Sequence, residues 1–148
     1  MDFTEKERET FRLREGDILV CEGGEVGRTA IWRNEIPECY YQKAIHRLRP
    51  RDNRINREFF LYHMINAFLI RGTYGIVGTT TTIAHLPGVK LKALKIPVPS
   101  RGEQDSIARI LAAVDQKIAA EEKRKAALQT LFKTALHQLM TGQIRTKV

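Results

Sequence analysis

This sequence has few of the residues from which metal and disulfide sites are built. Its 148 residues include only two cysteines, Cys21 and Cys39, and they form no CxxC pair. Neither has histidines at zinc-ligand spacing, so we expect two reduced thiols and no metal site. No apolar run reaches the ~18 residues of a membrane helix, and the polar N-terminus has no signal-peptide core. We therefore expect a soluble, cytoplasmic protein.

The signatures of several enzyme classes are also missing. There is no Asn/Asp-Pro-Pro-aromatic tetrad of a DNA methyltransferase, and no cluster of carboxylates beside Lys as in a nuclease. The glycine-rich stretch EGGEVG, residues 22–27, fits neither GxGxxG nor GK[ST], so nucleotide binding is disfavoured. The four histidines have no nucleophile or carboxylate at a suggestive spacing. We expect no enzymatic activity and assign no catalytic residue.

What the sequence does have is an excess of positive charge. Lys and Arg total 25 against 17 Asp and Glu, which gives a formal net charge of +8. The excess is concentrated in residues 43–57, the basic stretch, where six basic residues accompany one acid, Asp52. Such a run is either an ordinary solvated surface or the electrostatic footprint of a polyanion, and composition alone does not separate the two.

The first half of the chain has the pattern of a small mixed domain. Residues 1–15 are polar, and we expect them to be poorly packed. Alternating apolar residues predict strands over 18–21, 28–33 and 40–48. The first two strands flank the glycine-rich stretch, which favours a β-hairpin.

A helix and two extended segments follow. Asn56 is a suitable N-cap for a core helix over 57–71 that ends at Gly72. The threonine run and Ile83, residues 79–83, favour an extended conformation by β-propensity. We expect another extended segment over 89–98, after a turn at Pro87 and Gly88.

The last part of the chain predicts one long helix. Ser100 and Glu103 form a capping-box pattern, and neither Gly nor Pro occurs from 103 to 141, a stretch of 39 residues. Its apolar residues recur at alternating spacings of four and three, the period of a coiled coil, so a partner helix is implied. Glu121 and Lys125 interrupt this seam, and we expect them to meet across an antiparallel pair of helices. The seam residues are Ile107, Leu111, Val114, Ile118, Leu128, Phe132 and Leu139.

Taken in order, these segments resemble the specificity (S) subunit of type I restriction–modification systems. The resemblance covers about residues 13–148 and runs through GDILV, GGEVGRTAIW, YYQKAIHRLRP and EFFLYHM. It is strongest in L-x-x-L-x-I-P-x-P-x-x-x-EQ-x-x-I-A-x-x-L, residues 91–111, and in LMTG, residues 139–142. The joined pattern is specific, although no single piece of it is.

The resemblance implies an α+β fold: a small mixed α/β target recognition domain, residues 1–99, a long spacer helix, residues 100–142, and a tail, residues 143–148. The domain would read one half of a split double-stranded DNA site. The helix would pair in a homodimer or with another S subunit and set the distance between half-sites. Family members usually carry two recognition domains and two spacers, so one of each suggests a half-subunit or a fragment.

The resemblance also implies partners. Such subunits do no chemistry; they dock a methyltransferase (modification) subunit and, through the complex, a restriction subunit. S-adenosylmethionine would belong to the methyltransferase, and this chain would hold no cofactor. A function of another class stays open, in which the chain is an interaction or decoy subunit that assembles with modification or S subunits without binding DNA specifically.

The family's use of the hairpin loop and nearby strands suggests which residues contact DNA. The arginines 47, 49, 51 and 54 are expected on phosphates, with Lys43 and Arg71 behind them. Arg28, Gln42, Lys43 and the threonine run are expected on base edges, because Arg suits guanine and Gln suits adenine. The predicted set is Arg28, Gln42, Lys43, Arg47, Arg49, Arg51, Arg54, Arg71, Thr79, Thr80, Thr81 and Thr82.

Overall fold

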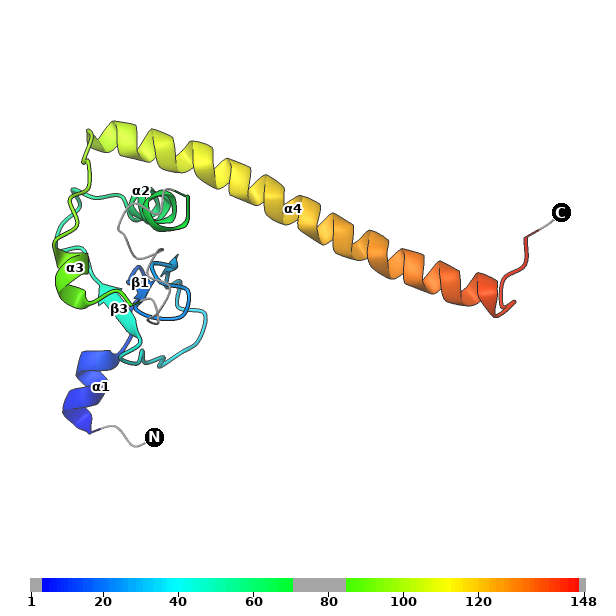
Figure 1. The fold of residues 1–148 in the computed structure, drawn as a ribbon, viewed down its shortest axis with the longest axis horizontal. Coiled ribbons are helices and arrows are strands. Elements are labelled where there is room, and N and C mark those ends of the chain that lie inside the picture. The colour runs from blue at the N-terminus through cyan, green and yellow to red at the C-terminus, as the bar shows by residue number, and fades with distance from the viewer. Residues whose placement is uncertain (1–3, 71–84, 147–148) are drawn as a thin grey trace. The chain divides into compact units, whose positions relative to one another are not determined.

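The chain has the expected α+β architecture, a small antiparallel sheet with short helices and then a long C-terminal helix (Figure 1). The computed structural model describes residues 4–70 and 85–146. It forms two compact units, Met1–Ala108 and Arg109–Val148. In the described part of the chain, no helix combines the length and the hydropathy that a membrane crossing requires.

The sheet has three strands, with β1 (Ile18–Cys21) between β2 (Thr29–Ile31) and β3 (Ile45–Leu48). Both neighbours run antiparallel to β1, and the predicted hairpin of β1 and β2 is confirmed. The register sets Ile18 opposite Ile31 and Leu48. Residues that face each other in this way point to the same side, so these side chains form one apolar face. Strands β2 and β3 are shorter than predicted.

The core lies between this apolar face and a helix. Helix α2 (Arg57–Met64) begins at the predicted N-cap, since the Asn56 side chain accepts a hydrogen bond from the Phe59 amide at 2.9 Å. It continues as a π-helix, η1 (Ile65–Ile70), so the predicted core helix is confirmed to that point. Gly72 and residues 79–83 lie outside the described residues. The buried cluster is Ile18, Val20, Met64, Ala67, Phe68, Leu86 and Leu91.

The N-terminal segment is more ordered than predicted. Residues Glu5–Phe11 form helix α1, although none of them is buried. A capping box that was not predicted from the sequence begins the helix: Thr4 and Glu7 satisfy each other's backbone amides. The Phe11 ring also packs edge-on against Tyr41, with ring centroids 5.4 Å apart.

The prediction of an extended segment over 89–98 is wrong at its start. Gly88–Lys92 forms a short helix, α3, with Pro87 at its N-cap position. The turn buries Leu91, which is 8% exposed, in the core cluster beside Leu86. Burial against the rest of the domain therefore outweighs the local preference for an extended chain.

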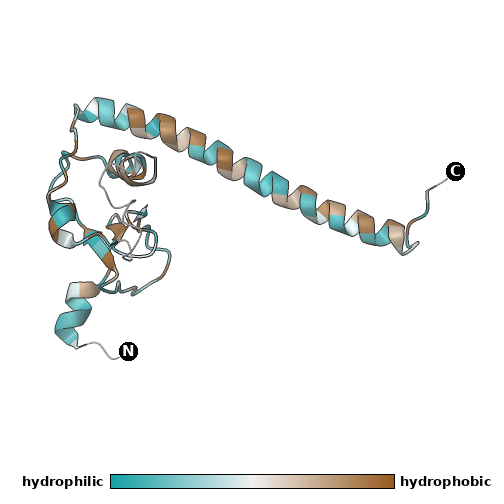
Figure 2. Cartoon of the chain, in the orientation of Figure 1, coloured by the Kyte–Doolittle hydropathy of each residue, from teal (hydrophilic) through white to brown (hydrophobic). Residues whose placement is uncertain are grey.

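The long helix α4 (Arg101–Met140) spans 40 residues without a break. Its start is fixed by Ser100, whose hydroxyl accepts a hydrogen bond from the Glu103 amide at 3.3 Å. Gly142, with φ of +70°, follows its last turn as predicted. The predicted seam is exposed, with Val114 at 52% and Phe132 at 67%. Figure 2 shows apolar and polar residues alternating along the helix.

Two glycines of the hairpin loop provide a test of the packing between the sheet and η1. Gly27 has φ of +79°, and a Cβ there would overlap the Phe68 ring; Gly24 has φ of +71° and open space around it. Gly27→Ala should lower the free energy of unfolding by about 3 kcal/mol, from left-handed strain plus overpacking. Gly24→Ala should cost only about 1 kcal/mol, from the strain alone. Urea denaturation of both variants checks this, and equal losses would contradict the close approach of Phe68.

Candidate nucleic-acid interface

The basic stretch contributes to an ion pair whose carboxylate is buried and whose guanidinium reaches the surface. Extending the β1–β3 register by one residue sets Arg49 opposite Asp17. The Arg49 Nε and Nη2 atoms donate to the two Asp17 carboxylate oxygens, each at 2.7 Å. Asp17 is 1% exposed and also accepts a hydrogen bond from the Arg14 amide at 2.8 Å. Arg49 therefore joins the end of β3 to the start of β1, and its guanidinium is already used inside the domain.

The charge state of this pair follows from its contacts. Burial of Asp17 raises the pKa of its carboxyl, but the hydrogen bonds from Arg49 and Arg14 outweigh burial, so the pKa lies below its ordinary value. The hydrogen bond to Asp17 in turn raises the pKa of Arg49. Both groups are therefore ionised at neutral pH.

Arg47, two residues earlier, also makes its contacts within the domain. Its guanidinium donates to the backbone oxygens of Thr10 at 2.9 Å and Arg12 at 3.3 Å. It lies 5.1 Å from the centroid of the Tyr41 ring, in cation–π geometry. Its Nε is buried and has no hydrogen-bond partner among the described residues. Arg47 thus holds the end of α1 against β3.

The other predicted DNA-contacting residues lie at the surface. Arg54 pairs with Asp52 at 2.8 Å, and Arg28 pairs with Glu25. Exposed pairs of this kind are weak and exchange readily for a phosphate. Three further members of the set are exposed and form no ion pair within the described residues: Gln42, Lys43 and Arg51. Arg71 and the threonines Thr79, Thr80, Thr81 and Thr82 lie outside the residues that the structure describes.

Gln104, in the motif of residues 91–111, has a structural role that was not predicted from the sequence. Gln104 is 1% exposed, and its side-chain oxygen accepts the Asn56 amide at 2.8 Å. Its side-chain nitrogen donates to the backbone oxygens of Arg54 at 3.0 Å and Pro99 at 2.9 Å. The amide thereby joins the start of α4 to the N-terminus of α2. The Glu-Gln dipeptide was a visible signal, but two of the three partners of Gln104 are about fifty residues away in the sequence.

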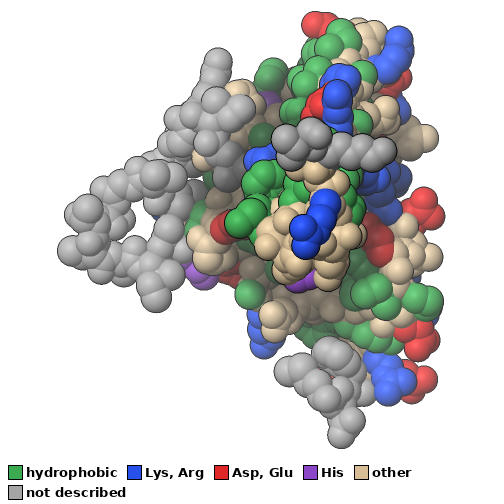
Figure 3. Space-filling view, turned by 90° about the vertical axis from the view of Figure 1, so that its right-hand side faces the viewer, with side chains coloured by type: hydrophobic (Ala, Val, Ile, Leu, Met, Phe, Trp, Pro, Cys, Tyr) green, Lys and Arg blue, Asp and Glu red, His purple; other side chains and the backbone are tan. Residues whose placement is uncertain are grey.

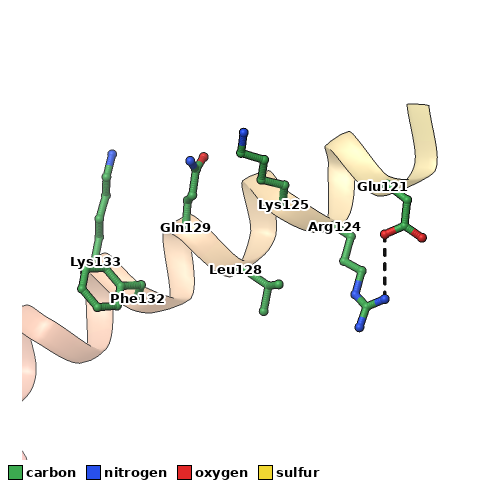
Figure 4. Close-up of a pocket in the computed structure, with 7 residues that line it drawn as sticks. All are labelled: Glu121, Arg124, Lys125, Leu128, Gln129, Phe132 and Lys133. Atoms are coloured by element: carbon green, nitrogen blue, oxygen red, sulfur yellow. Dashed lines mark ion pairs between the residues drawn. The ribbon is translucent and has the colours of Figure 1, made fainter. Parts of the chain in front are cut away.

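Further along α4 the seam forms an open apolar groove. Figure 4 shows Leu128 and Arg124 on one side of the helix, and Lys125, Gln129 and Lys133 on the other. Leu128 is 56% exposed and Phe132 is 67% exposed, so this strip is not buried by the chain itself. Glu121, at the end of the groove, pairs with Lys117 at 3.0 Å and Arg124 at 3.8 Å.

Most of this chain is similar in sequence to known proteins. Residues 2–130 match the family described as Type I restriction modification DNA specificity domain. The chain is 26% identical over 141 residues to the type I restriction enzyme MjaVIII specificity subunit of Methanocaldococcus jannaschii, covering 91% of this chain and 32% of that protein. It is 26% identical over 133 residues to the MjaIX specificity subunit of the same organism, covering 88% and 30%.

A solved structure shares the fold. It comes from work on complex assembly and conformational transition of the type I R-M system, and the superposition has a TM-score of 0.65 at 24% identity. The match covers 84% of this chain and 29% of that one.

The chain belongs to the family of type I restriction–modification DNA specificity domains. Specificity subunits are non-catalytic components of these systems, as the sequence analysis predicts for this chain. The chain spans about a third of the length of the MjaVIII and MjaIX subunits.

The Asp17–Arg49 pair predicts how stability depends on pH. Because the Asp17 pKa is lowered by folding, the stabilisation is complete above the unfolded value of about 3.9 and is lost as pH falls through the lower folded pKa. Asp17→Asn should cost about 2–4 kcal/mol at pH 7, and this difference from wild type should shrink at acidic pH.

Denaturant unfolding at a series of pH values measures the effect. Asp52→Asn is the matched control, because it removes a carboxylate from an exposed pair with Arg54, and its stability should stay near that of wild type. Equal losses of unfolding free energy in the two variants at neutral pH would show that the Asp17–Arg49 pair contributes no more to stability than an exposed ion pair does.

Proposed function

We propose that this chain recognises one half of a split double-stranded DNA target as the specificity component of a type I restriction–modification system. The match to the DNA specificity domain over residues 2–130 carries the proposal. Residues 1–99 act as the recognition domain, residues 100–142 as the spacer helix and residues 143–148 as a tail. A methyltransferase subunit, which holds S-adenosylmethionine, docks on the chain, and the restriction subunit joins through the complex.

The observed contacts divide the predicted residues into two groups: those that hold parts of the domain together and those that we propose to contact DNA. Arg47 and Arg49 position β3 and the N-terminal segment through hydrogen bonds inside the domain. The exposed cations Lys43, Arg51 and Arg54 contact phosphates, which supply affinity and orientation. Base reading falls to Arg28, Gln42 and Lys43, with the threonine run Thr79–Thr82 in support, and Arg71 supports the phosphate contacts.

Specific recognition should survive salt that removes non-specific binding. Rounds of selection from a random duplex pool at about 0.2 M salt should enrich one short motif, since non-specific binding of a cationic protein falls steeply between 50 and 200 mM salt. Arg51→Gln should weaken binding to all sequences and reduce the salt slope by about one, whereas Gln42→Ala should relax the preference at one position. A pool that stays random would instead favour the interaction or decoy subunit.

We further propose that a second copy of this chain covers the α4 seam in antiparallel orientation. The seam is symmetric about residue 123, so apolar residues of one copy meet apolar residues of the other. At the centre Glu121 of each copy meets Lys125 of the other, whereas a parallel pair would place like charges together. The apolar pairs are Ile107 with Leu139, Leu111 with Ala135, Val114 with Phe132, and Ile118 with Leu128.

Charge reversal tests both the pairing and its direction. Wild type should sediment as a dimer, at twice the 17.0 kDa of the chain. Glu121→Lys should weaken the dimer about tenfold by creating two repulsive contacts, and adding Lys125→Glu should restore it.

Circular dichroism of each variant serves as the control for helix content, because Glu121 also pairs with Lys117 and Arg124 within the chain. A monomeric wild type, or a double variant as weak as the single one, would contradict antiparallel self-pairing. A monomer that pairs only with a longer S subunit would identify that subunit's spacer as the partner.

A further inference from the structure

Helix α3 and the segment after it carry positive charge only. Residues 85–102 contain Lys90, Lys92, Lys95 and Arg101, and no acid. Arg101 pairs with Asp105 at 2.8 Å. The three lysines, here named the α3 lysines, are all exposed, and none of them forms an ion pair in the described parts of the chain. The sequence analysis did not include them among the DNA-binding residues.

The α3 lysines lie on or just after a helix that packs against the core of the domain. Leu91, between Lys90 and Lys92, is 8% exposed and belongs to the buried core. The backbone just before α3 is tied to β3 and to the residue after β1: the His46 Nε2 atom lies 2.7 Å from the Leu86 oxygen, and the Leu86 amide donates to the Glu22 backbone oxygen at 2.7 Å. Figure 1 shows α3 beside β3. Lys90 and Lys92 therefore project from a helix that is packed against the domain, and Lys95 follows it by three residues.

The α3 lysines differ from Arg47 and Arg49 of the basic stretch in what their side chains already contact. Arg47 and Arg49 already donate to groups inside the domain, so a phosphate would have to displace those bonds. Figure 3 shows that, on the face it presents, basic side chains lie among acidic ones. A lysine without a carboxylate neighbour keeps its full charge for phosphate and contributes fully to counterion release.

We propose that the α3 lysines form a second phosphate-contacting surface for duplex DNA, separate from the basic stretch. This inference rests on the proposed function for its partner. The ammonium groups bind the sugar–phosphate backbone without regard to sequence, so they fix the orientation of the domain on the duplex and do not read bases.

The test is the salt dependence of binding by the full chain to a labelled duplex of random sequence between 50 and 200 mM NaCl. The triple variant Lys90→Gln, Lys92→Gln, Lys95→Gln should flatten the slope of log K against log salt by about 2–3, from about 0.9 per lost phosphate contact. The single variant Lys95→Gln lies outside α3, so it cannot unfold that helix, and it should flatten the slope by about one.

A matched control removes the same charge elsewhere. The variant Lys6→Gln, Arg109→Gln, Lys123→Gln changes three exposed cations that form no ion pair within the described residues, and its slope should stay near that of wild type. Equal flattening in the two triple variants would reduce the effect to net charge and overturn the inference. An unchanged slope in the α3 variant would overturn it as well.

The outcomes separate this inference from the proposed function. Sequence enrichment by wild type together with an unchanged slope in the α3 variant would leave the function standing and remove the α3 lysines from the interface. An α3 variant that binds DNA normally but no longer binds a purified methyltransferase subunit would make this surface a protein contact and overturn the inference. A wild type that binds no duplex at 50 mM NaCl would overturn both.

Discussion

The buried Asp17 carboxylate is the constraint on which the recognition domain depends. An ionised carboxylate that is 1% exposed is tolerated only when a cation and hydrogen-bond donors satisfy it. The Arg14 amide supplies one donor, and Arg49 supplies the cation and two more donors only when β3 stands in its observed register against β1. A slip of β3 by one residue would break the ion pair and turn Leu48, which packs against the core, to the other face of the sheet.

This constraint changes how the positive charge of the chain is interpreted. A net charge of +8 suggests one broad basic surface, but the cations differ in what they already contact. Arg47 and Arg49 are held by groups of the domain itself, whereas Lys43, Arg51 and the α3 lysines face solvent without an ion pair in the described structure. In a cationic protein, the cations without an ion pair are the ones that can add contacts to a polyanion without first losing an interaction within the domain.

The junction between the recognition domain and the long helix also depends on a buried polar side chain whose hydrogen bonds are satisfied within the chain. Gln104 satisfies three backbone groups around the start of α4, so the first turn of the helix is part of the domain core. Beyond Ala108 the helix leaves that unit and exposes its apolar seam. A helix whose first turns belong to the domain and whose later turns expose an apolar seam has the features that the proposed spacer role requires.

Local signals in the sequence determined the hairpin, the N-cap at Asn56, the limits of α4 and the period of its seam, because caps, glycines and apolar spacing act over a few residues. The family resemblance likewise rested on motifs that the sequence displays directly. Only the tertiary structure decided that residues 88–92 turn into α3, that Arg49 is committed to Asp17, and that Gln104 meets Arg54 and Asn56. Each of these outcomes depends on burial or on partners more than thirty residues apart in the sequence. The sequence alone does not show whether a basic side chain forms an ion pair within the domain or stays available to bind DNA.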